Sequence, residues 1–98
     1  MYVRVWEYEV PTESVGAFVA AYGPDGEWAR LFRRGRGYLS TDLYRQDGGG
    51  DRFLTVDRWV DQDSWRSFLD TSRSAYDALD ARLEGLATTE RALVEGNG

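Results

Sequence analysis

The sequence predicts an α+β fold in which an antiparallel sheet carries its helices on one face. The first indication is an apolar strand that ends at Trp59 and passes through an acidic turn into a helix near Trp65. A similar strand-then-helix pair opens the chain, over residues 2–10 and 13–22. The length of 98 residues suits one domain. We therefore expect residues 1–98 to form a single domain built on one sheet.

The first half of the chain contains the signals of one strand and two helices. Residues 2–10 are rich in Val, Trp and Tyr and stop at a proline, which is typical of a strand. Thr12 is expected to cap a helix over residues 13–22, where apolar side chains recur at helical spacing. A Gly-Pro-Asp-Gly turn ends this helix, and a shorter helix is predicted over residues 27–34.

The middle of the chain predicts a β-hairpin. The sequence predicts strands over residues 38–46 and 52–60, and a flexible turn over the glycine-rich segment 47–51 between them. The two strands are therefore expected to pair.

A long helix and a final strand complete the prediction. Asp61 or Asp63 is expected to cap the helix, and its apolar face is interrupted near residues 71–72. Residues 88–94 form either a short last strand or an extension of the helix. With the strand, the element order is β-α-β-β-α-β, the ferredoxin-like arrangement with an antiparallel sheet.

Both faces of the predicted sheet carry apolar side chains. Strand alternation separates Val3, Val5, Leu54, Val56 and Val60 from Tyr2, Trp6, Tyr8, Phe53, Thr55 and Trp59. A sheet with one solvated face alternates apolar with polar residues, and the helices cover one face only. A second copy of the chain is the simplest cover for the other face, so we predict a homodimer joined through the sheet faces.

Composition excludes several classes of function. The net charge of −5 argues against nucleic acid as the main partner. The sequence has no apolar run long enough for a membrane span and no signal-peptide pattern, so we expect a cytoplasmic protein. Because Cys and His are both absent, the sequence offers no thiolate nucleophile, no Ser-His pair and no metal site of the usual kind.

The strand that ends at Trp59, the acidic turn and Trp65 resemble the antibiotic biosynthesis monooxygenase family of dimeric α/β barrels. The segments YGPDGEWARLFRR and RFLTVDRW are similar to those of a small bacterial subgroup, and the resemblance runs from VRVWEYEV through LDARLEGL. It implies stacked sheets in a dimer, a pocket between sheet and helices, and oxygen insertion into phenolic or anthrone-like aromatics without metal, flavin or other cofactor. Haem-degrading members need a helix His, and Phe68 stands there in this sequence.

An unusually large set of aromatic residues is available to bind a flat ligand by stacking. The substrate-binding candidates are Trp6, Tyr22, Trp28, Phe32, Trp59, Trp65, Phe68 and Tyr76, with Tyr8 beside them. The alternative is that these residues form the core and the dimer interface. Tyr22 and Tyr76 also offer hydroxyls from the two main helices, either to a substrate oxygen or to solvent.

Charged residues inside strands supply the catalytic candidates, because ionised side chains are rarely buried without partners. Asp57 or Glu7 in a desolvated pocket would act as a general base. Arg4 or Arg58 would stabilise a substrate anion or superoxide there. The alternative is that these residues form ion pairs between strands or subunits.

Three functions remain open. The first is a cofactor-independent monooxygenase for an electron-rich aromatic small molecule. The second keeps the pocket but isomerises or cyclises the substrate without O₂, and the third is a non-catalytic dimer that binds a small aromatic molecule. Both enzymatic hypotheses require a pocket with a volume above about 300 Å³ between the sheet and the helices.

Overall fold

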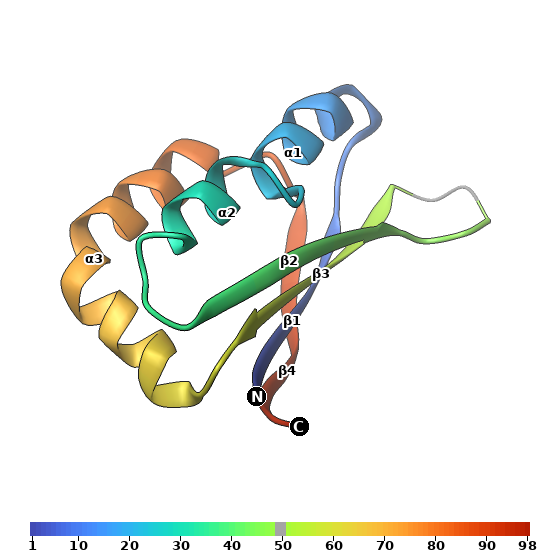
Figure 1. Ribbon diagram of the computed structural model, residues 1–98. Helices are drawn as coiled ribbons and strands as arrows, with labels where there is room; N and C mark the ends of the chain where they lie inside the picture. The colour runs from blue at the N-terminus through green and yellow to red at the C-terminus, as the bar shows by residue number, and fades with distance from the viewer. Residues whose placement is uncertain (49–50) are drawn as a thin grey trace.

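The computed structural model describes residues 1–48 and 51–98, and it has the predicted α+β, ferredoxin-like order of elements (Figure 1). In chain order these are β1 (Tyr2–Glu9), a 3₁₀ turn η1 (Thr12–Ser14), α1 (Val15–Tyr22), α2 (Glu27–Phe32), β2 (Tyr38–Arg45), β3 (Arg52–Trp59), α3 (Gln62–Leu83) and β4 (Thr89–Asn97).

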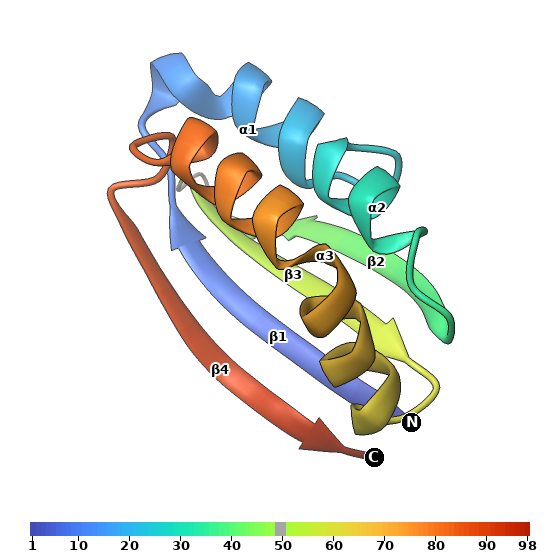
Figure 2. The ribbon, with the colours of Figure 1, turned by 90° about the vertical axis from the view of Figure 1, so that its left-hand side faces the viewer.

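Within the described residues, the strands form one antiparallel four-stranded sheet in the order β2-β3-β1-β4. Figure 2 shows α1 and α2 following one another in a row, with α3 beside them, all on one face of this sheet. The predicted hairpin of β2 and β3 is confirmed, although residues 49–50 of its turn lie outside the described part of the chain. The last strand is also confirmed, because β4 pairs with β1 along its length.

The helix boundaries correct one expectation and confirm two. Thr12 does not cap the first helix: its hydroxyl instead donates to the Asp51 carboxylate at 2.6 Å, and α1 begins at Val15 after the 3₁₀ turn. Asp61 does cap α3, where its carboxylate accepts from the Ser64 amide at 2.8 Å. The predicted interruption of α3 lies at Ser72, whose φ of −121° and ψ of 19° are non-helical.

Aromatic side chains dominate the layer between helices and sheet. Trp59, Phe18 and Phe68 are almost completely buried. Phe32 of α2 packs edge-on against Trp59 and Phe68, with ring centroids 5.8 and 5.5 Å apart. Such edge-to-face packing adds to the free energy gained by burying the rings. The core thus holds α2 and α3 against β3.

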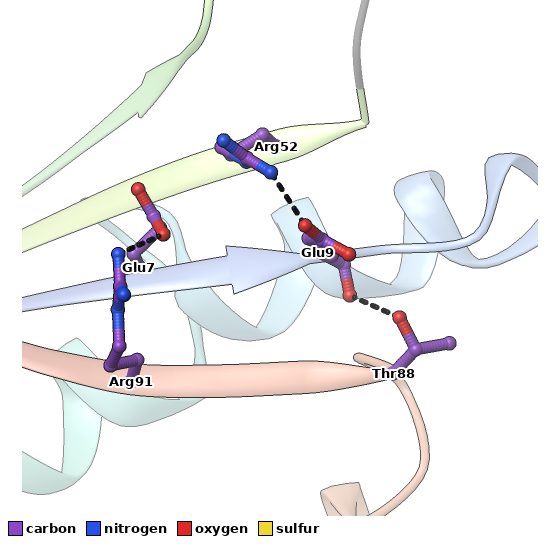
Figure 3. A network of polar contacts seen from close by, with 5 residues as sticks. All are labelled: Glu7, Glu9, Arg52, Thr88 and Arg91. Atoms are coloured by element: carbon purple, nitrogen blue, oxygen red, sulfur yellow. Dashed lines mark hydrogen bonds and ion pairs between the residues drawn. The ribbon is translucent and has the colours of Figure 1, made fainter.

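The opposite face of the sheet is apolar at its centre and carries charged residues toward both ends of the strands. Val3, Val5, Leu54 and Val56 lie on this open face, and the structure places no helix over it among the described residues. Ion pairs join neighbouring strands on this face. Glu7 pairs with Arg91 and Glu9 with Arg52 (Figure 3), and Asp42 pairs with Arg58. No helix in the described part of the chain is long and apolar enough to cross a membrane.

Candidate active site

A small cavity lies between the helix layer and the covered face of the sheet. It is lined by Arg4, Trp6, Tyr8, Tyr22, Trp28, Phe32, Thr41, Thr55, Asp57, Trp65, Tyr76, Asp80 and Glu90. Its volume is about 70 Å³. As formed by the described residues, this cavity is well below the ~300 Å³ at which ligand pockets begin, so it does not provide the larger pocket that was expected.

The alternation of strand side chains explains which residues reach the cavity. Arg4, Trp6 and Tyr8 are every second residue of β1 and share its covered face. Asp57 and Thr55 do the same on β3, and Thr41 of β2 lies directly opposite Asp57 in the pairing register. Each strand therefore presents a polar group inside a mainly aromatic wall.

Asp57 is the carboxylate at the sheet wall of the cavity. The Thr41 hydroxyl donates to its Oδ1 at 2.6 Å, and the Tyr38 hydroxyl lies 2.7 Å from Thr41 Oγ1. Burial raises the pKa of Asp57 from 3.8 to about 6, against smaller opposing effects of the Thr41 hydrogen bond and the Arg4 charge. A carboxyl with this pKa is ionised at pH 7 and accepts a proton readily.

Arg4 is the cation of the same cavity. Its guanidinium carbon lies 3.9 Å from the ring centroid of Trp65, which is cation–π contact. It also donates to the Glu95 carboxylate at 3.0 Å, and its side chain is only 12% exposed. The two contacts hold the guanidinium beside the cavity, where one face of it is stacked on an aromatic ring.

The cavity tyrosines are donors rather than bases. Burial raises the pKa of Tyr22 to about 12 and also raises the pKa of Tyr8 and Tyr76. Their hydroxyls therefore stay protonated at neutral pH. Each of them is suited to donate a hydrogen bond to an oxygen in the cavity.

A second acidic group lies at the end of the cavity formed by α3 and β4. Glu90 of β4 pairs with Tyr8 in the register, and Asp80 of α3 lines the same end. Burial, with the nearby charges of Asp80 and Glu84, raises the pKa of Glu90. Sequence reasoning missed Glu90 because the existence of the last strand was itself uncertain, and it missed Asp80 because the apolar pattern of α3 does not mark a polar residue that faces the cavity. It also missed Thr41 and Thr55, although Thr55 precedes Asp57 by the two residues that put them on one face.

Two of the four predicted catalytic candidates lie elsewhere. Glu7 and Arg58 face the open side of the sheet, where they pair with Arg91 and Asp42 (Figure 3 for Glu7). Each is adjacent in sequence to a cavity residue, and consecutive strand residues point to opposite faces. For Glu7 and Arg58 the ion-pair interpretation therefore describes the structure, whereas Arg4 and Asp57 are brought together at the cavity.

The aromatic candidates divide in a similar way. Trp6, Tyr22, Trp28, Phe32, Trp65 and Tyr76 line the cavity. Trp59 and Phe68, at 0% and 1% exposure, belong to the core behind it. The periodicity of the sequence places all eight side chains in one layer but does not separate the wall of a cavity from the packing beneath it.

Comparison with known proteins identifies the family. The family model described as antibiotic biosynthesis monooxygenase matches residues 1–78. No curated protein matches the sequence. Among solved structures, SnoaB from Streptomyces nogalater, a cofactor-independent oxygenase, aligns with a TM-score of 0.68 at 17% identity over 99% of this chain and 94% of its own.

Two further structures share the fold. A candidate antibiotic biosynthesis monooxygenase from Nitrosomonas europaea aligns with a TM-score of 0.69 at 16% identity, over 98% of this chain and 88% of its own. PA3566 from Pseudomonas aeruginosa aligns with a TM-score of 0.64 at 14% identity, over 99% and 94%. Because the family model spans most of the sequence and the structures agree in fold, this chain belongs to the antibiotic biosynthesis monooxygenase family.

Proposed function

We propose that the protein is a cofactor-independent monooxygenase that acts on an electron-rich aromatic small molecule, phenolic or polyketide-like. The observation that carries the proposal is Asp57, a half-buried carboxylate with a pKa of about 6 in an aromatic-lined cavity that also contains Arg4. A desolvated base beside a cation and stacking surfaces suits the formation of a substrate anion. Membership of the family supports the same reaction class.

The proposed reaction begins when Asp57 accepts a proton from the substrate. The resulting anion transfers one electron to O₂, and the substrate radical and superoxide recombine to a peroxide. Protonation by Asp57 and loss of water then leave a new carbonyl group at the attacked carbon. One oxygen atom enters the substrate and the other leaves as water, so a CH₂ group supplies the four electrons that O₂ requires.

Arg4 has the complementary role in this scheme. Its fixed positive charge lowers the free energy of the substrate anion and of superoxide, because both carry negative charge in a poorly solvated space. Its contacts with Trp65 and Glu95 orient the guanidinium before the substrate arrives. The charge therefore needs little reorganisation during the reaction.

The size of the cavity sets a condition on this proposal. A volume of about 70 Å³ is smaller than a single-ring phenol, so the aromatic wall must move outward when a substrate binds. The same condition applies to the second candidate, a dimer that binds a small aromatic molecule without catalysis, because its ligand needs the same space. Product mass separates the alternatives, since a monooxygenase adds an oxygen atom and an isomerase or cyclase leaves the mass unchanged.

We also propose that the protein functions as a homodimer joined through the open faces of two sheets. Val3, Val5, Leu54 and Val56 form the apolar centre of that face, and Tyr44 and Val94 beside them are 54% and 50% exposed. A second copy would cover all of these side chains.

The test is oxygen consumption with anthrone as the substrate. We expect wild-type protein to consume O₂ and to yield a product with one added oxygen, and we expect D57N to reduce the rate by about 100-fold or more. The matched control is D42N, because Asp42 is a strand carboxylate on the open face. Turnover that persists unchanged without O₂ refutes the oxygenase assignment, and equal rates in D57N and D42N refute the role of Asp57.

A further inference from the structure

The indole of Trp28 is the least explained polar group at the cavity. Trp28 belongs to α2, its side chain lines the cavity, and it is only 7% exposed. Its Nε1–H has no hydrogen-bond partner among the residues that the structure describes. A buried donor without an acceptor is costly, and such groups in native proteins call for an explanation.

The ring itself is well held, so the position of the N–H group is defined. Trp28 stacks on Phe32 with centroids 5.6 Å apart and contacts Tyr76 at 5.0 Å. These contacts fix the indole plane at the helix side of the cavity. The orientation of the donor is therefore set by packing and does not depend on a polar partner.

Tyr22 is one internal alternative as a partner for this N–H group. The Trp28 N–H lies close enough to the Tyr22 hydroxyl to lower the pKa of that phenol, although burial has the larger, opposite effect. Among the described residues, however, no hydrogen bond of acceptable geometry links the two side chains. Because both groups line the cavity, an acceptor atom placed between them would receive hydrogen bonds from two directions.

Trp59 provides an internal comparison. Its Nε1–H also lacks a partner within the described residues, but the side chain has 0% exposure and is absent from the cavity wall. The unpaired donor of Trp59 is thus enclosed by the core, where no ligand reaches it. The unpaired donor of Trp28 belongs to a side chain that borders empty space.

We propose that the Trp28 Nε1–H donates a hydrogen bond to an oxygen atom of the bound aromatic molecule and thereby selects substrates that carry an acceptor oxygen. This inference rests on the proposed function and specifies its substrate class as aromatic ketones and phenols rather than hydrocarbons of the same shape. An indole N–H only donates, so an acceptor is required. With the oxygen at Trp28 on the helix side, the ring lies toward Asp57 on the sheet side.

The test uses two probes of the same shape. Acetophenone has a carbonyl acceptor, whereas α-methylstyrene has a CH₂ group in its place. We expect wild-type protein to prefer acetophenone by roughly tenfold in Kd, measured by NMR titration under anaerobic conditions. W28F keeps an aromatic ring and removes the donor, so the preference should fall to about one. W59F removes the other unpaired donor and should retain the preference for acetophenone.

A second measurement needs no variant. Acetophenone should move the indole proton signal of Trp28 downfield, and α-methylstyrene should not. An equal preference in wild type and W28F, an unmoved indole signal, or no binding of either probe at millimolar concentration each overturn the inference. Its failure is distinct from failure of the proposed function: O₂ consumption with an unchanged probe ratio rejects only the role of Trp28, and the predicted ratios without O₂ consumption reject only the oxygenase.

Discussion

Replacement of Asp57 by Asn is expected to stabilise the protein at neutral pH. Burial raises the pKa of Asp57 from 3.8 to about 6, so the folded state holds its proton over a pH range in which the unfolded chain releases it. At 1.36 kcal/mol per pKa unit, this rise corresponds to about 3 kcal/mol. Asn has nearly the same shape and offers an oxygen to the Thr41 hydroxyl, but it carries no charge to desolvate.

The sign of the pH dependence follows from the direction of this shift. Below pH 3.8 Asp57 is protonated in both states and favours neither. As the pH rises to about 6, the unfolded state ionises first, so the free energy of unfolding of the wild type decreases relative to D57N. Above pH 6 the difference levels off.

The assay is urea unfolding of wild type and D57N from about pH 3.5 to about pH 7.5, a range that brackets the unfolded and folded pKa values of Asp57. Other titrating groups, Glu90 included, contribute to both proteins and cancel in the difference. D42N, on the open face, should show no such pH-dependent gain. A difference between D57N and wild type that stays flat across this range would mean that Asp57 is not desolvated as the structure indicates.

Three further predictions concern the site, the core and the dimer. T41V removes the hydroxyl that donates to Asp57, so the pKa of Asp57 should rise further, as measured by carboxyl ¹³C NMR. T41S should restore the wild-type pKa, and an unchanged pKa in T41V would contradict the hydrogen bond. F68A empties a core site that is 1% exposed and should reduce the free energy of unfolding by about 3–5 kcal/mol in chemical denaturation, and a loss below about 1 kcal/mol would mean the core is not packed there. V5D places a charge at the centre of the open face and should yield monomers in sedimentation velocity, whereas a V5D dimer would reject this interface.

The fold was predictable because its signals are local. The Val- and Trp-rich strands, the proline after β1 and the Asp61 cap each follow from a few adjacent residues. Where the prediction differed, a distant residue had intervened. Thr12 was expected to cap α1, but Asp51 lies within reach in the folded chain and accepts its hydroxyl proton instead.

The types of residue in the candidate site could be predicted from the sequence, but only some of the individual residues could. Strand alternation puts Asp57 on the same face as Thr55 and Glu7 on the same face as Val3 and Val5, but the prediction left open which of the two acids faces the cavity. The contribution of Glu90 depends on the pairing of β4 with β1, which joins residues about 80 positions apart. No local pattern carries that information.

By itself, the sequence determined the order of the elements as far as the long helix, the apolar character of both sheet faces and the lack of imidazole and thiol chemistry. These are properties of single residues and of short periodic segments. Tertiary structure decided that Arg4 and Asp57 meet under the helices, that Arg58 pairs with Asp42 on the far side, and that Trp28 borders a cavity while Trp59 fills the core. Burial raises the pKa of Asp57 only because strands and helices distant in sequence exclude water from it together.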